Sequence, residues 1–220
     1  MTPGQRPIAI LLDLLAFAAG LGMAWAFGWQ AKDLVWGLWL SSLVVGYTTI
    51  VVGIGRGVFR GLQSPWEPGD LLGFMLSLLL GGFLLTFFTI HFGGFHFVHS
   101  VFLNLFFPIV DATDLPSEGL YAEVFRRYWP FLAAAFLAER AALRTAWTAP
   151  LDFRRGGGQA VVGAPYRNVV RMHLMIFFFA FANVMGLDSF GVYAVVFAVY
   201  FFPWRTILGR REPSVPSASP

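Results

Sequence analysis

Long apolar runs, separated by short polar or proline- and glycine-containing stretches, make up most of the sequence. The runs cover residues 8–29, 34–55, 71–107, 121–142, 166–185 and 190–208. Apolar residues do not alternate with polar ones in them, and a helix needs about 20 predominantly apolar residues to cross a membrane. The pattern therefore predicts an all-α, polytopic membrane helical bundle with about six transmembrane helices.

The third run is too long for one straight span. It covers 71–107 and has no acidic or basic side chain other than histidine. A straight helix of that length would extend about 55 Å, against a hydrocarbon core of about 30 Å. We expect it to bend or turn at the glycine pairs 81–82 or 93–94, because glycine loosens a helix. One kinked helix and two separate segments both remain open.

The composition agrees with a membrane protein and excludes several chemistries. Hydrophobic residues make up 57% of the chain and charged residues 12%, whereas a soluble domain carries about 25% charged residues. The absence of cysteine excludes disulfides, cysteine-ligated zinc, iron–sulfur clusters and thiol catalysis. Rhomboid-type serine, zinc-protease and phosphate-loop motifs are also missing. The sequence therefore predicts no reaction.

The basic residues flank the apolar runs, which predicts topology rather than nucleic-acid binding. If the runs alternate in direction, one side of the membrane receives twelve arginines, at positions 6, 56, 60, 140, 144, 154, 155, 167, 171, 205, 210 and 211. The other side receives Lys32, Arg126, Arg127 and the acidic loop 108–119. By the positive-inside rule both termini are cytoplasmic. We expect one membrane domain over 1–211 and a disordered cytoplasmic tail over 212–220.

All four histidines lie in or beside apolar runs. His91, His96 and His99 belong to the segment HFGGFHFVHSVF, and His173 belongs to RMHLMIFF. Ionisable side chains at membrane depth are expensive and mark candidate functional sites, here for a metal, a haem, a proton or a quinone. On a straight helix His91 and His99 lie about 12 Å apart and cannot share one metal. The alternative is that these side chains form hydrogen bonds between helices.

Three further polar residues interrupt the runs. Asp13 lies inside the first run, where it can pair with a basic group, hydrogen-bond a neighbouring helix or relay protons. Asn104 and Asn183 are single amides in apolar surroundings, which is typical of hydrogen bonds between helices. Tryptophans lie mostly near the expected span ends, as an aromatic belt requires, at positions 25, 29, 36, 39, 129 and 204.

Two stretches, HFGGFHFVHSVF and PYRNVVRMHLMI, resemble the signature segments of a family of small bacterial multi-pass membrane proteins of unknown function. We expect the protein to lie in the bacterial inner membrane. The resemblance runs from the second to the sixth helix. It matches His91 and His99 in the first segment and His173 in the second, but not His96. In the second helix Ser41 and Ser42 stand where the family is expected to carry an acidic residue and an amide.

Three functions are compatible with these observations. The first is an accessory or scaffold membrane subunit, favoured by short loops and by helices rich in glycine and aromatic residues. It would contact the lipid bilayer and other membrane subunits. The second is a histidine-ligated metal or haem protein that uses His91, His99 and His173. The third is a small proton-coupled transporter, for which Asp13 is the one clear carboxylate within a span.

Overall fold

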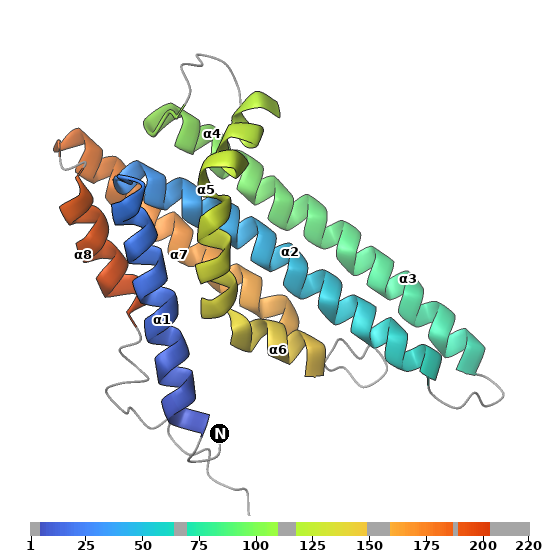
Figure 1. Ribbon diagram of the computed structural model, residues 1–220. Coiled ribbons are helices and arrows are strands. Elements are labelled where there is room, and N and C mark those ends of the chain that lie inside the picture. The colour runs from blue at the N-terminus through green and yellow to red at the C-terminus, as the bar shows by residue number, and fades with distance from the viewer. Residues whose placement is uncertain (1–4, 64–69, 110–117, 149–158, 187–188, 203–220) are drawn as a thin grey trace, which may run out of the picture.

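The computed structural model describes residues 5–63, 70–109, 118–148, 159–186 and 189–202, and every regular element in this part of the chain is helical (Figure 1). The all-α prediction is therefore confirmed for the described residues. The elements are α1 Gln5–Ala26, α2 Ala31–Gln63, α3 Asp70–Phe88, the π-helical turn η1 Thr89–Gly93, α4 Gly94–Phe106, α5 Glu118–Ala138, α6 Arg140–Thr148, α7 Gln159–Val184 and α8 Phe190–Phe201.

Within the described residues, three helical stretches are long and apolar enough to cross a membrane. They are Pro7–Ala26, Ala31–Gln63 and Leu71–Phe106. The apolar helix Phe190–Val199 is shorter. The structure thus supports a membrane protein, while six spans and the side on which each terminus lies stay predictions. The expected tail 212–220 and most of the expected acidic loop lie outside the described residues.

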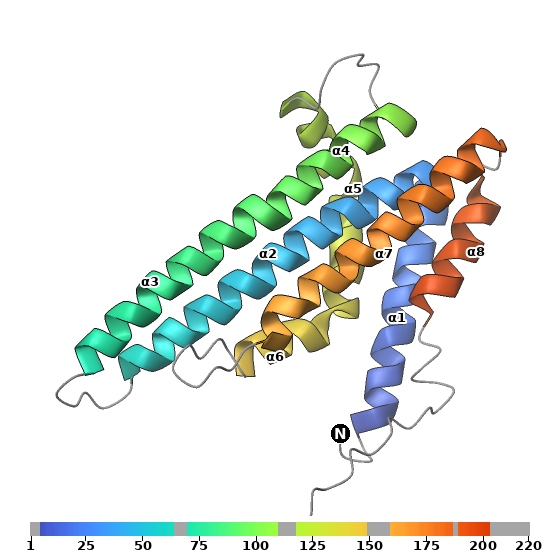
Figure 2. The ribbon, with the colours of Figure 1, turned by 180° about the vertical axis from the view of Figure 1, so that it is seen from behind.

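The long third run forms one continuous helix rather than two separate segments, and its irregularity lies at Thr89–Gly93, beside the glycine pair 93–94. Backbone angles stay helical across the junction, with φ −64° and ψ −42° at Gly93 and φ −59° and ψ −44° at Gly94. The irregularity takes the form of the π turn η1, which fits an extra residue into a helix without reversing it. Figure 2 shows α3 and α4 following one another along a single line.

Helix α2 lies at the centre of the bundle. It packs mainly against α5, α7 and α6, and less extensively against α3, α4 and α8. It runs antiparallel to the α3–η1–α4 helix (Figures 1 and 2). Helix α1 packs against α5 and α8 instead. The main core consists of apolar side chains from most of these helices, among them Trp36, Tyr128, Leu103, Phe179 and Tyr193.

Several boundaries differ from the sequence-based expectation. Helix α2 starts at Ala31, within the short stretch between the first two apolar runs, and continues past the end of its run at 55 to Gln63. The preceding turn contains Gly28, whose φ of +65° is strained for other residues. Helix α5 ends at Ala138, and α6 leaves in a different direction, as Figure 1 shows.

Candidate functional site

The histidine segment forms two rows of aromatic rings along the α3–η1–α4 helix. In the first row the ring of His91 lies 5.4 Å from that of Phe87 and 4.9 Å from that of Phe95, and the Phe95 ring lies 6.3 Å from His99. In the second row the ring of Phe92 lies 4.3 Å from that of His96. Side chains four residues apart share a helix face, which explains both rows.

The first row places His91 on the surface of the molecule. Its side chain is exposed, and it also approaches Tyr166 of α7, with ring centroids 5.8 Å apart. Neighbouring apolar side chains are exposed as well, at 50% for Phe87 and 71% for Ile90. His91 is therefore an imidazole on an otherwise apolar, outward-facing surface.

The second row is part of a buried group of polar and aromatic side chains between α2, α4 and α5. This group, called the buried seam below, consists of Trp36, Trp39, His96, Ser100 and Tyr121. His96 is 1% exposed, and its Nδ1 lies 2.9 Å from the Phe92 carbonyl oxygen. A carbonyl oxygen can only accept, so Nδ1 carries a proton. Next to it Ser100 Oγ lies 2.9 Å from the Tyr121 hydroxyl, and the Tyr121 ring stacks on Trp39 at 5.8 Å.

Two tryptophans that the sequence pattern assigned to an aromatic belt are buried in this seam. The indole Nε1 of Trp39 donates to the His96 carbonyl oxygen at 2.8 Å, and that of Trp36 donates to the Phe107 carbonyl oxygen at 2.8 Å. The belt interpretation is wrong for these two, because they hold α4 against α2 from inside the bundle. Trp25 and Trp129 are 75% and 57% exposed, as a belt requires.

The predicted histidine set is only partly brought together. His91 faces outward and His99 is 4% exposed, with the ring of Phe95 between them. The side chains of His173 and Asn183 lie outside the described residues, although α7 carries both positions. Asn104 is half-buried on α4. Among the described side chains, no group of three or more His, Cys, Asp or Glu residues is arranged to hold a metal ion.

Asp13 has the basic partner that was one of its expected roles. Its Oδ1 lies 2.6 Å from Nη1 of Arg140, which also donates to the Leu137 carbonyl oxygen. The other nitrogen, Nη2, donates to the Ala9 carbonyl oxygen at 2.9 Å. Arg140 thus joins α1 to the junction between α5 and α6. The pairing favours a structural role for Asp13 over proton relay.

Sequence reasoning missed the most buried carboxylate among the described residues. Asp33 is 6% exposed, and its Oδ1 accepts a 2.6 Å hydrogen bond from the Tyr128 hydroxyl. Its Oδ2 accepts from the backbone N–H of Gln30 at 2.8 Å. The spacing of Gln30 and Asp33 is that of a helix-capping residue in the first turn, which favours a carboxylate there. That spacing was the only available signal, and an exposed turn explains it equally well.

The model of a protein family of unknown function (DUF6498) matches residues 4–202 of the chain. The chain belongs to that family. Its membership confirms the resemblance to an uncharacterised family. No curated protein and no solved structure matches the chain.

The residues matched by the family model span the whole described structure. Residues 4–202 include every described element, from the start of α1 to the end of α8. The outward histidine, the buried seam and the Asp33 contact therefore all belong to the shared region. The matched region ends before the tail 212–220.

Proposed function

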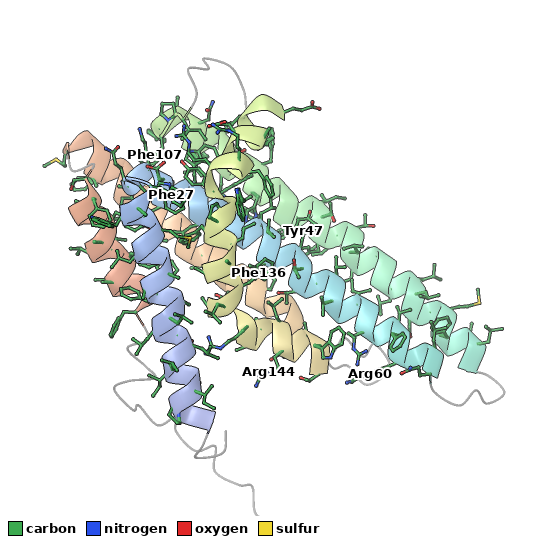
Figure 3. The ribbon with its side chains drawn as sticks, viewed as in Figure 1. Phe27, Tyr47, Arg60, Phe107, Phe136 and Arg144 are labelled. Atoms are coloured by element: carbon green, nitrogen blue, oxygen red, sulfur yellow. The ribbon has the colours of Figure 1, made fainter. Side chains whose placement is uncertain are left out.

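We propose that this family member is a multi-pass inner-membrane protein of bacteria that works as a scaffold or accessory subunit. Six helical passes with cytoplasmic termini are supported by the grouping of arginines. Arg60 and Arg144, on α2 and α6, lie at the end of the bundle where α1 begins (Figure 3). Arg126 and Arg127 lie on the first half of α5, which starts at the other end.

One observation carries the scaffold role: the chain leaves His91 exposed near the middle of a very apolar helix. His91 lies close to the centre of the stretch Leu71–Phe106. A second estimate agrees, because Phe92 packs against Gly46, which lies near the middle of the apolar run 34–55 on α2. Both observations support a mid-membrane depth for the imidazole, where an unsatisfied polar group facing lipid is costly.

A protein partner removes that cost more readily than lipid does. Acyl chains offer no hydrogen-bond donor or acceptor, whereas a transmembrane segment with a serine, threonine, asparagine or histidine offers both. The rings of Phe87 and Phe95 on either side of His91 supply a rigid, exposed surface for close packing. We therefore assign the partner-binding surface to the face of α3–η1–α4 that presents Phe87, His91 and Phe95.

Site-specific photo-crosslinking in the native membrane tests this role. A photoreactive phenylalanine analogue replaces Phe87 in one variant and Phe177 of α7, which is 72% exposed, in another. Because only the first position lies on the proposed surface, we expect a protein adduct of one defined mass at Phe87 and only lipid adducts at Phe177. Adding His91→Leu should reduce the Phe87 adduct several-fold. An adduct of twice the chain mass identifies the partner as a second copy.

The opposite result is equally informative. Lipid adducts alone at both positions mean that lipid covers His91, and the scaffold role then fails. Equal protein adducts at both positions mean that proximity is non-specific, with the same consequence.

A histidine-ligated metal or haem is the second candidate, supported by the orientation of His96. An imidazole that donates Nδ1–H to a backbone carbonyl is held as metal-binding histidines commonly are, with Nε2 as the ligating atom. His99 lies nearby, with ring centroids 6.4 Å apart. The test is an absorption spectrum with metal analysis of protein purified in mild detergent, beside His99→Ala. A colourless, metal-free preparation removes this candidate.

A further inference from the structure

A second surface lies at the α6 end of the bundle. It carries the positive charge of Arg56, which no acidic side chain among the described residues neutralises. The apolar run of α2 ends at Gly55, so Arg56 is the first charged residue after a stretch of about 33 Å. This length places Arg56 at a membrane boundary. Helix α6 packs beside it, with Ala146 fully buried near Val52 and Ile54 of α2.

Arg56 is held in place by an aromatic ring rather than by an acid. Its guanidinium carbon lies 4.1 Å from the ring centroid of Trp147 and 5.5 Å from that of Phe59. The buried Nε has no hydrogen-bond partner among the described residues, and their ion pairs do not include Arg56. The cation–π contact orients the guanidinium and leaves its charge uncompensated.

The surroundings fit the interface between lipid headgroups and acyl chains. Trp147 is 54% exposed, and indole rings favour the headgroup level of a membrane. Phe59 and Leu62 on the same stretch of α2 are 47% and 54% exposed. Arg144 is exposed on α6, one turn before Thr148.

Helix α6 is fixed in this position by two other arginines. Nη2 of Arg60 donates to the Thr148 carbonyl oxygen at 2.9 Å, which holds the end of α6 against α2 (Figure 3). Arg140 holds its beginning through the ion pair with Asp13. Arg144 and Trp147 are therefore presented by a helix that is anchored at both ends, and Trp147 contacts Arg56 of the neighbouring α2.

We propose that Arg56, Arg144 and Trp147 bind the phosphodiester of an anionic phospholipid. A guanidinium matches the geometry of phosphate oxygens, and basic groups at the cytoplasmic membrane surface attract anionic headgroups. The exposed Phe59 and Leu62 favour a lipid over free phosphate, because acyl chains cover them while the headgroup reaches the arginines. This site is separate from the proposed partner-binding surface on α3–η1–α4.

Lipid titration of the full chain in neutral detergent tests the site. Phosphatidylglycerol, phosphatidylcholine with the same acyl chains, and inorganic phosphate are added separately. Bound lipid is counted by native mass spectrometry, and the unfolding temperature is recorded in parallel. We expect retention and stabilisation by phosphatidylglycerol only, and Arg56→Gln should weaken its affinity about fivefold. The control is Arg126→Gln on α5, which should bind like the wild type.

The outcomes separate this inference from the proposed function. Equal retention of both lipids, or unchanged affinity in Arg56→Gln, overturns the site, and stabilisation by inorganic phosphate alone overturns the choice of a lipid. If Arg56→Gln does not fold, the exposed Arg144→Gln carries the same expectation. Neither readout depends on the crosslink at Phe87, so either proposal can fail while the other stands.

Discussion

Helix α2 and the α3–η1–α4 helix are both long and apolar, yet they occupy opposite environments. In the most apolar 18-residue window of each helix, 61% of the residues are buried in α2, against 11% in the window within Leu71–Phe106. The more buried helix, α2, is the less apolar of the two. Its mean hydropathy is 1.7, against 2.3 for the α3–η1–α4 helix. In a membrane, apolarity makes a helix compatible with lipid, while the position of small and polar residues decides which helix lies inside.

Particular residues of α2 illustrate this rule. A Cβ atom added to Gly46 would lie 2.5 Å from the Phe92 ring, so the absence of a side chain allows the two helices to approach. Thr49, buried beside it, satisfies its hydroxyl within α2 by donating to the Val45 carbonyl oxygen. By contrast, Leu72 and Leu79 of α3 are 66% and 69% exposed.

The largest expected effect comes from shortening a leucine on each helix. Leu34 of α2 is 1% exposed, and Leu79 of α3 is 69% exposed. Leu34→Ala should lower the free energy of unfolding by about 2 kcal/mol or more, because it leaves a cavity, whereas Leu79→Ala should change it by less than about 0.5 kcal/mol. Denaturant unfolding in mixed micelles measures both. Equal losses would mean that α3 is as closely packed as α2.

Glycine substitutions within α2 test the close approach directly. Gly46→Ala places a methyl group against the buried Phe92 ring and should cost about 1–3 kcal/mol. Gly55→Ala, in the same helix, meets nothing within 4 Å and should be neutral or slightly stabilising. The same unfolding measurement compares them. A neutral Gly46→Ala would show that Phe92 can move aside and that the contact does not position α3.

The two buried tyrosines near Asp33 should respond differently to loss of the hydroxyl. Tyr128→Phe removes the 2.6 Å hydrogen bond to Asp33 and should cost about 1 kcal/mol. The Tyr193 hydroxyl is also buried but has no hydrogen-bond partner among the described residues. Tyr193→Phe should therefore be neutral or stabilising. A clear loss in Tyr193→Phe would reveal that its hydroxyl has a partner in the membrane-embedded protein, such as a bound water.

The sequence predicted the class of the fold because hydropathy over about 20 residues reports directly on the solvent. It did not predict contacts between distant residues. Asp13 and Arg140 are 127 positions apart, and no local pattern links them. Asp33 stands in the sequence between two apolar runs, where nothing indicates that Tyr128 from α5 buries it. The glycine pair 93–94 indicated where the run 71–107 is irregular, but the sequence did not predict that the irregularity takes the form of a π turn.

The smallest expected effect on stability is at His91, which lies exposed on the less buried of the two helices. His91→Phe keeps an aromatic ring between Phe87 and Phe95 and removes no buried contact, because the side chain is exposed. The free energy of unfolding of the isolated chain should change by less than about 0.5 kcal/mol. If a partner covers this face, the same change should weaken the Phe87 crosslink, because the ring is retained while its hydrogen-bonding nitrogens are lost. A large loss of stability in the isolated chain would instead mean that His91 makes stabilising contacts within the bundle. The face of α3–η1–α4 that carries it would then not be a partner-binding surface.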